Sequence, residues 1–463
     1  MTDKQLLRLA AVLVAGILAP VLDSTIVTIA LHAIGTDFGA SLTALQWVVT
    51  AYLLAMALAI PLAGWSTTRF GGRRMWIGAL AVFLAGSVGC ALAPSIGALI
   101  AFRAVQGAGA GLLIPIMTTL LIQAAAGRPL GKLMAAVALP ALVGPILGPV
   151  VGGLIVNHLD WRWVFYVNVP ICVAGLAAAV AGLPRDASTG RTAHLDVLGL
   201  LLLSPALAAI VYGLAEVGAH GGFAYAAVLG PLAAGSLLLV FFVRHALRRR
   251  DRALVDLRLF ADRRFALSCA LLFLTGFSLF GAMLLLPLYY PQVRGAGALG
   301  AGLLLAPQGV GALLSRGWLG ARTDTWGPRP VIVLCTLLTA AGTVAFAFAG
   351  THTAEWLLAV SLLVRGAGLG GITMAVMASA YTGMDSADVP HASTATRIAQ
   401  QVGASFGAAI FAVVLATRLG AHPADVAGAF DDAFWWALAL AALPVIPALL
   451  LPQPVSSRPV PAA

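Results

Sequence analysis

The segment GWSTTRFGGRR (64–74) follows an apolar run, and its spacing recurs in GARTDTWGPR (320–329) after another apolar run. In both copies a second glycine follows the first by seven residues, and an arginine comes two residues later. Glycines permit a tight turn and a close approach of helices, and arginines suit the cytoplasmic edge of a membrane. The recurrence therefore indicates two related halves that enter a membrane in the same orientation.

A second pair of segments supports the same repeat. Gly107-Ala108-Gly109-x-Gly111 in the first half matches Gly366-Ala367-Gly368-x-Gly370 in the second. Both pairs keep the same order along the chain, which is typical of parallel repeats related by an axis along the membrane normal. We therefore predict two equivalent helix bundles.

The composition is that of a membrane protein. The 463 residues are 61% hydrophobic and 10% charged, and the mean hydropathy is +0.99. Soluble domains carry about 25% charged residues, so this chain has too little polar surface to cover a soluble globule. Lipid-exposed open sheets leave backbone groups unpaired in hydrocarbon, which favours an all-α fold with many spans.

At about 20 residues per span, the apolar segments predict fourteen transmembrane helices. We expect an N-terminal six-helix bundle in residues 1–183, two inserted spans with cytoplasmic loops in 184–264, a C-terminal six-helix bundle in 265–451 and a disordered tail in 452–463. The predicted spans are 8–33, 43–64, 75–95, 97–121, 134–156, 163–183, 197–215, 223–243, 265–290, 300–321, 331–350, 355–378, 392–417 and 433–451. We expect the first span to be uncleaved, because it contains Asp23 and is not followed by a small-residue cleavage site.

The distribution of Lys and Arg predicts the orientation by the positive-inside rule. With the N-terminus in the cytoplasm, the outer side receives only Arg162, Arg294 and Arg418. The cytoplasmic side receives Lys4, Arg8, Arg69, Arg73, Arg74, Arg128, Lys132, Arg185, Arg191, the cluster from Arg244 to Arg264, Arg322, Arg329 and Arg458. This accounts for the net charge of +10 without nucleic-acid binding, so both termini are predicted to be cytoplasmic.

Residues 244–265 form the longest hydrophilic stretch. Leu254, Leu257 and Phe260 would suit an amphipathic helix at the membrane interface, and a solvated cytoplasmic loop is the equal alternative. The cysteines, at positions 90, 172, 269 and 335, lie in apolar runs without metal-ligand spacing. No metal or disulfide is expected.

Several motifs resemble one known family. They are Leu22-Asp23-Ser24-Thr25-Ile26-Val27, the loop 64–74, Arg103-Ala104-Val105-Gln106-Gly107, Gly144-x-x-x-Gly148-Pro149-x-x-Gly152-Gly153, Trp161-Arg162-Trp163 and Asn168-Val169-Pro170. On these residues the chain resembles the major facilitator superfamily, specifically its fourteen-span drug:proton antiporter branch. The resemblance implies a multi-pass protein of the bacterial cytoplasmic (inner) membrane, with two bundles that open alternately to each side.

The resemblance assigns gating roles to the glycine-rich motifs. In the first loop Thr68 replaces the carboxylate of the family motif, whereas the second copy retains Asp324. If that carboxylate latches the inner gate, the latch is weakened in one half. The predicted gating residues are Gly64, Thr68, Arg69, Gly71, Arg73, Gly144, Gly148, Pro149, Gly152, Gly153, Gly320, Asp324, Gly327 and Arg329. A positive-inside turn with no gating role is the alternative for the loops, and ordinary close packing is the alternative for GxxxG.

Asp23 and Arg103 are the predicted proton-coupling pair. At 1.5 Å per residue, both lie about 20 Å above the cytoplasmic face in a hydrocarbon core of about 30 Å. An arginine inside a span is costly unless it is paired or wetted, and a carboxylate beside it responds to both the cation and desolvation. A static ion pair that holds two spans together is the alternative.

The remaining polar residues inside the spans suggest a substrate cavity. Its predicted members are Asp23, Gln106, Arg365, Arg397, Gln400 and Gln401. G-x-x-x-x-G-K-[ST] is absent, so no cofactor is expected and the proton gradient would supply the energy. The sequence thus predicts an antiporter that exports small amphipathic or lipophilic compounds.

Two other functions stay open. The balance of one deep acid, Asp23, against Arg103, Arg365 and Arg397 is compatible with export of a specific anionic metabolite or lipid. A membrane-embedded enzyme or sensor is the remote alternative, because the spans contain no nucleophile–base or metal constellation. The expected partners are a small-molecule substrate, protons and the lipid bilayer, and nucleic acid is not among them. The sequence does not identify partner proteins.

Overall fold

The computed structural model describes residues 3–125, 128, 130, 134, 148, 151–156, 158–186, 194–249, 253–296, 298–350, 353–422 and 425–452. Every secondary-structure element assigned within these ranges is a helix. Helices satisfy their own backbone hydrogen bonds, which hydrocarbon requires of a lipid-exposed segment. The predicted all-α class is therefore confirmed.

The first half forms the N bundle. Its helices are α1 (Asp3–Phe38), α2 (Leu42–Ala59), α3 (Leu62–Phe70), α4 (Gly72–Ala91), α5 (Ile96–Ala125), α8 (Trp163–Tyr166) and α9 (Asn168–Gly182). A bend of 54° separates α2 from α3. Pro61 lies at this break, where its missing N–H and ring interrupt the helix.

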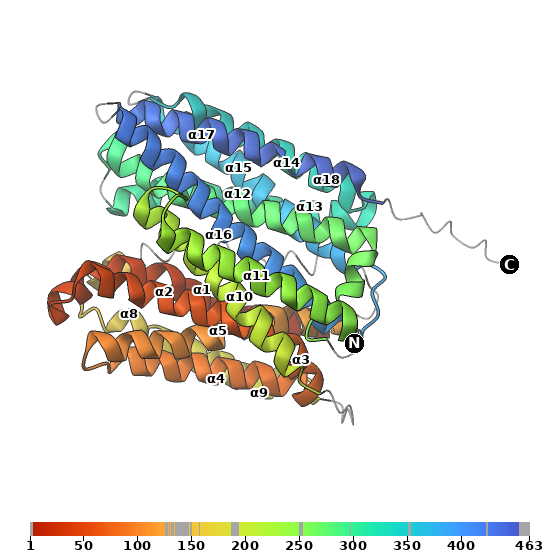
Figure 1. The fold of residues 1–463 in the computed structure, drawn as a ribbon. Coiled ribbons are helices and arrows are strands. Elements are labelled where there is room, and N and C mark those ends of the chain that lie inside the picture. Colours follow the sequence, from red (N-terminus) through yellow and green to blue (C-terminus); the bar gives the residue numbers. More distant parts are fainter. Residues whose placement is uncertain are drawn as a thin grey trace.

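The second half forms the C bundle, and the inserted segment precedes it (Figure 1). The inserted elements are α10 (Val197–His220), α11 (Ala226–Arg249) and η2 (Leu257–Ala261). The C bundle consists of α12 (Arg263–Arg294), α13 (Ala298–Trp326), α14 (Pro328–Val344), η3 (Ala345–Phe348), α15 (Glu355–Tyr381), α16 (Val389–Ala421), α17 (Val426–Ala442) and α18 (Val445–Leu450).

Among the described residues, 11 helices are long and apolar enough to cross a membrane, or 12 if α2 and α3 form one bent span. The α13 helix, which covers the predicted tenth span, is not among them. Most of the predicted fifth span, 134–156, lies outside the described residues. The chain is a multi-span helical protein, and the number fourteen stays a prediction.

The sequence repeat is also a repeat of packing. In the N bundle, a Cβ added at Gly107 would meet the carbonyl of Tyr52 in α2, and one added at Gly109 would meet Ala79 and Phe83 in α4. The α5 helix therefore lies close to α2 on one face and to α4 on another. Only glycine permits both approaches.

The C bundle repeats this arrangement. A Cβ added at Gly366 would meet the carbonyl of Gln308 in α13, and one added at Gly368 would meet Cys335 and Thr339 in α14. The α15 helix thus packs on α13 and α14 as α5 packs on α2 and α4.

The inserted helix α10 contacts both bundles (Figure 1). On the N-bundle side, the Ser204 hydroxyl donates to the Leu58 carbonyl at 2.8 Å, and Tyr212 stacks on Trp47 with ring centroids 6.0 Å apart. On the C-bundle side, apolar residues of α10 pack against Ala409 and its neighbours in α16. The inserted segment is therefore placed across the boundary between α2 and α16.

The loop before α12 differs from the predicted amphipathic helix. Its described part, residues 253–262, contains only the short helix η2, and Leu254 is buried in the core rather than laid on a membrane surface. The Leu254 N–H donates to Asp196, and its carbonyl contacts His391 of α16 at 3.2 Å.

Asp256 of the same loop has a lowered pKa. Partial burial alone would raise the pKa, but the hydrogen bonds that Arg258 donates to the carboxylate outweigh this effect.

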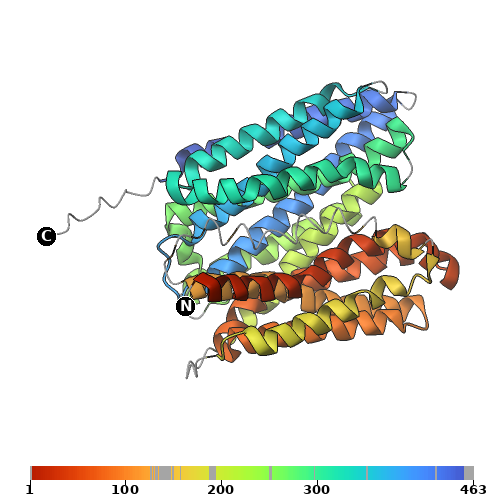
Figure 2. The same cartoon turned by 180° about the vertical axis from the view of Figure 1, so that it is seen from behind.

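Apolar contacts join the two bundles at one end. We call this end the predicted cytoplasmic face; α3 and α18 lie there (Figures 1 and 2). One buried cluster at this face includes residues of both bundles, whereas the opposite ends have separate clusters in the N bundle and the C bundle. The described conformation is therefore closed at the predicted cytoplasmic face.

Candidate functional site

A buried ion pair lies inside the N bundle. Asp23 of α1 and Arg103 of α5 are 0% and 1% exposed, and Arg103 Nη1 lies 2.5 Å from Asp23 Oδ2. The sequence predicted that these charges share a depth, and the structure brings them into direct contact. Their role in proton coupling stays a prediction.

Three neutral side chains complete a network around Asp23. Gln106 Nε2 and Asn168 Nδ2 each donate to Asp23 Oδ1 at 2.9 Å, and both also donate to the Ser87 hydroxyl. Arg103 Nη1 donates to Gln106 Oε1 at 2.6 Å. The carboxylate thus accepts three hydrogen bonds, which is what stabilises a charge removed from water.

Arg103 has two further contacts in α2. Its Nε donates to the Val48 carbonyl at 3.1 Å, and its guanidinium lies 4.2 Å from the centroid of the Tyr52 ring. A buried ion pair is favourable only when additional hydrogen bonds satisfy the remaining donors and acceptors. Gln106, Asn168 and Val48 supply such hydrogen bonds to the pair, whereas Asn168 Oδ1 in the same network is buried without a partner.

Asn168 and Ser87 were not predicted as site residues. Asn168-Val169-Pro170 was recognised only as a family-like motif, and its amide at the start of a span was the available signal. Ser87 had no comparable signal, because a serine in a span is common and bonds readily to its own helix.

The C bundle holds Arg365 at the corresponding place. A Cβ at Gly86 would meet Gln106, and one at Gly342 would meet Arg365, so Arg365 occupies the repeat position of Gln106. Its Nε donates to the Thr343 hydroxyl at 3.3 Å and its Nη1 to Gln308 Oε1 at 2.7 Å. Both acceptors are neutral.

Arg397 lies at the boundary between the bundles. It follows Ser393 by one helical turn of α16, and the Ser393 hydroxyl is 2.8 Å from the Thr119 hydroxyl of α5. Arg397 Nη1 donates to Gln400 Oε1 at 3.1 Å. Gln401 lies one turn further on; its carbonyl accepts from Ser405. The structure thus separates the predicted cavity residues into an N-bundle network and a C-bundle set.

The loop 64–74 has a structural contact that the sequence did not reveal. Asp186, which follows α9, accepts from the backbone N–H of Arg73 at 2.8 Å and of Arg74 at 3.1 Å. It therefore caps α4 directly after Gly71, whose φ of 93° favours glycine. The Thr68 hydroxyl donates to the Gly64 carbonyl of its own helix at 3.0 Å.

The other predicted gating residues lie around the same face. Gly64 packs against the Pro390 carbonyl of α16, where an added Cβ would lie 2.9 Å away. Arg69 lies beside the Phe70 ring, and Arg73 Nη2 donates to the Val180 carbonyl at 2.6 Å. Gly320 and the exposed Asp324 lie in the last two turns of α13. Gly327, with a φ of 83°, separates α13 from α14, and Arg329 lies in the first turn of α14.

The glycine motif of the fifth predicted span is partly described. A Cβ added at Gly148 would meet the Thr25 side chain of α1, and one added at Gly152 would lie 3.4 Å from Ile26. An added Cβ at Gly153 would have no neighbour within 4 Å. Gly144 and Pro149 lie outside the described residues.

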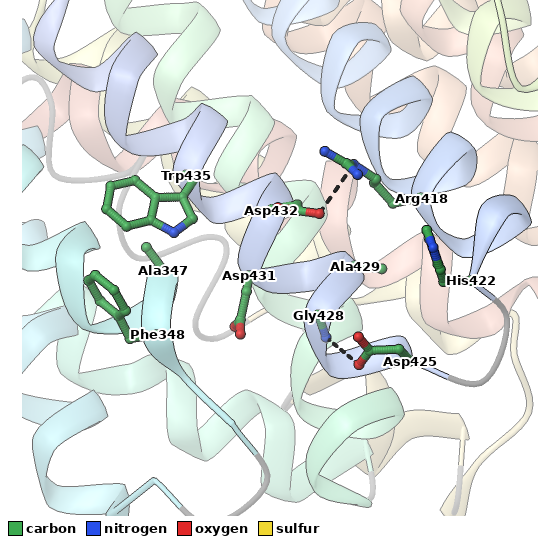
Figure 3. A pocket seen from close by; sticks show the side chains of 10 residues that line it. All are labelled: Ala347, Phe348, Arg418, His422, Asp425, Gly428, Ala429, Asp431, Asp432 and Trp435. Carbon is green, nitrogen blue, oxygen red and sulfur yellow. Dashed lines mark hydrogen bonds and ion pairs between the residues drawn. The ribbon is translucent and has the colours of Figure 1, made fainter.

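A surface cavity of about 520 Å³ lies where the C-terminal end of α16 meets the start of α17 (Figure 3). Asp425 caps α17 by accepting from the Gly428 N–H, and Arg418 Nε lies 3.2 Å from Asp432 Oδ2. Phe348 and Trp435 form an edge-to-face pair beside them. This cavity belongs to the C bundle alone and is separate from the Asp23 network.

Within the described ranges, no group of three or more His, Cys, Asp or Glu side chains is placed to hold a metal ion. The polar groups of the candidate site are suited to proton transfer and to binding small polar or charged groups.

Comparison with known proteins identifies the family of this chain. The sequence model of the Major Facilitator Superfamily matches residues 12–195 and 195–412. The chain belongs to the Major Facilitator Superfamily. It is therefore a multi-pass membrane transporter rather than an enzyme, and the family prediction is confirmed.

Relatives and solved structures agree with this family. The chain is 38% identical to a multidrug resistance protein B homolog of Mycobacterium tuberculosis, over 89% of this chain and 77% of the relative. It is 31% identical to the putative multidrug resistance protein MdtD of Cronobacter sakazakii, over 94% and 92%. The proton:xylose symporter XylE shares the fold, with a TM-score of 0.64 at 17% identity over 98% and 97% of the two chains.

Proposed function

We propose that this transporter exports small amphipathic or lipophilic compounds in exchange for protons, by alternating access between the N and C bundles. The observation that carries the proposal is the buried Asp23–Arg103 pair. A titratable carboxylate inside a span is costly and is retained where a charge must change during transport. The relatives of the chain include proteins named for multidrug resistance, which supports this substrate class.

The asymmetric contacts between the bundles support alternating access. Residues of both bundles share a core at the predicted cytoplasmic face, and Thr119 contacts Ser393 there. For the opposite state this core must separate and the outer ends must meet. Rocking of two related bundles about a central site is the physical basis of such exchange.

We further propose that the protein lies in the bacterial cytoplasmic membrane with both termini in the cytoplasm. The positive-inside pattern supports this orientation. The proton gradient would be the energy source, with no cofactor. Besides protons and substrate, the bilayer itself is the expected partner.

Vesicle transport with and without a pH gradient tests proton coupling. Asp23→Asn removes the titrating group while keeping its shape, and we expect export to lose its dependence on the gradient. Asp23→Glu restores a carboxylate and should recover part of that dependence. Export is compared at equal amounts of folded protein, and full gradient-driven export by Asp23→Asn contradicts the proposal.

The packing of the fifth predicted span on α1 gives a second test. Gly148→Leu places bulk against Thr25, two residues from Asp23, whereas Gly153→Leu adds bulk where a Cβ has no neighbour. We expect Gly148→Leu to reduce export and Gly153→Leu to retain it. Equal export by the two variants would remove the glycine motif from the mechanism.

A further inference from the structure

Buried charge is distributed unequally between the two bundles. Arg103 in the N bundle is paired with Asp23. In the C bundle Arg316 and Arg365 are 4% and 3% exposed, whereas no described Asp or Glu of this bundle is fully buried; Asp431 is partly buried, with one buried carboxylate oxygen. Arg365 bonds to neutral acceptors, and none of the three guanidinium nitrogens of Arg316 has a hydrogen-bond partner. The C bundle therefore has an excess of positive charge in its interior.

Arg397 adds another positive charge of the C bundle, at the boundary between the two bundles. It is only partly buried, and its guanidinium donates to the neutral Gln400. One turn earlier on the same helix, Ser393 contacts Thr119 of the N bundle, and residues one turn apart share a helix face. The guanidinium of Arg397 thus lies just beyond the contacts that close the predicted cytoplasmic face.

An uncompensated cation in a medium of low dielectric attracts an anion strongly and repels a second cation. A ligand that brings its own acid group would supply the partner that the C bundle lacks. An amine ligand would add to the unpaired charge. The excess positive charge of the C bundle therefore favours anionic ligands over cationic ones.

We propose that the substrate of this transporter is an amphipathic anion whose carboxylate or sulfonate pairs with Arg397. This inference rests on the proposed export function, because it names the substrate class of that function. Arg316 and Arg365 act at longer range: they keep the interior of the C bundle positive and so favour the same ligand charge. Gln400 orients the guanidinium through the hydrogen bond at 3.1 Å.

Three probes with one fluorophore test the ligand charge: dansylglycine is anionic, its methyl ester is neutral, and dansyl-ethylenediamine is cationic. Binding to the full chain in lipid nanodiscs is measured at neutral pH by dansyl fluorescence. We expect dansylglycine to bind most tightly and the amine least. Arg397→Gln should weaken dansylglycine binding about tenfold or more, the size of a charge-assisted hydrogen bond, while ester binding is unchanged.

Two further variants control for structure and for general charge. Arg397→Lys keeps a cation and should retain a preference for dansylglycine over the ester. Arg418→Gln removes an arginine from the same helix that is exposed and already paired with Asp432, and it should leave all three affinities unchanged. Tightest binding of the amine, or unchanged dansylglycine binding by Arg397→Gln, would overturn the inference.

Transport separates this inference from the proposed function. If wild-type vesicles export the neutral ester under a pH gradient but dansylglycine neither binds nor moves, export stands and the anion preference is wrong. If dansylglycine binds through Arg397 but no probe crosses the membrane, the anion site stands and the proposed export is wrong.

Discussion

The N bundle and the C bundle use one scaffold for two different electrostatic sites. Gln106 and Ser87 in the N bundle correspond to Arg365 and Thr343 in the C bundle, and both pairs form a side-chain hydrogen bond. The N-bundle site includes Asp23 and is close to charge balance. The C-bundle site has a cation with neutral partners. At this repeat position the N bundle therefore has a glutamine that bonds to a carboxylate, whereas the C bundle has an arginine with neutral partners.

The largest expected effect is the loss of charge balance in the N bundle. Asp23→Ala leaves Arg103 buried without a counter-ion, and we expect the free energy of unfolding to fall by about 3–5 kcal/mol. Denaturant unfolding in detergent measures this. Asp432→Ala removes an acid whose pair with Arg418 is exposed, and it should cost less than about 1 kcal/mol. Similar losses for both would mean that the Asp23 pair has no special energetic role.

The repeat itself predicts matched steric effects. Gly107→Ala and Gly366→Ala each place a methyl group against a backbone carbonyl of the neighbouring helix, which we expect to cost about 1–3 kcal/mol in either bundle. Gly97→Ala, on α5 but with no neighbour within 4 Å, should be neutral or stabilising because alanine favours a helix. Thermal unfolding of the three variants compares them. Tolerance of one site and not the other would show that the two bundles do not pack equivalently.

A smaller effect is expected from the cation of the C bundle. Arg365→Met removes a buried charge that has no carboxylate partner, so the relief of its desolvation offsets the lost hydrogen bonds. We expect a loss of less than about 2 kcal/mol, clearly below that of Arg103→Met. Unfolding measurements on both variants check the order. An equal loss would imply that Arg365 is paired with a negative group.

The smallest effect concerns the start of α4 and its counterpart α14. Asp186 caps α4 through two backbone N–H groups, and Asp186→Ala should cost about 1 kcal/mol. At α14, Pro328 and Pro330 lack an N–H, so fewer donors there need a cap, and Pro330→Ala should change stability little. Unfolding midpoints test the contrast. An unchanged midpoint in Asp186→Ala would mean that water replaces the cap.

The sequence by itself determined the class of protein, the repeat and the identity of the buried ion pair. Apolar spans, glycine spacing and basic loops are local patterns, and each has one physical explanation in a membrane. Asp23 and Arg103 could be paired from the sequence because depth along two helices follows from a fixed rise per residue. The predicted number of fourteen spans stays a prediction, because 11 or 12 candidate spans lie among the described residues and most of the predicted fifth span lies outside them.

Only the tertiary structure decided which side chains contact the residues that the sequence singled out. Asn168 and Ser87 join Asp23, and Asp186 caps α4, because helices far apart in the sequence pack side by side. Leu254 is buried rather than interfacial because Asp196 and α16 hold its loop. The rotation of each helix about its axis depends on every neighbour at once. Spacing in one chain therefore predicts the depth of a residue, whereas packing decides its partners.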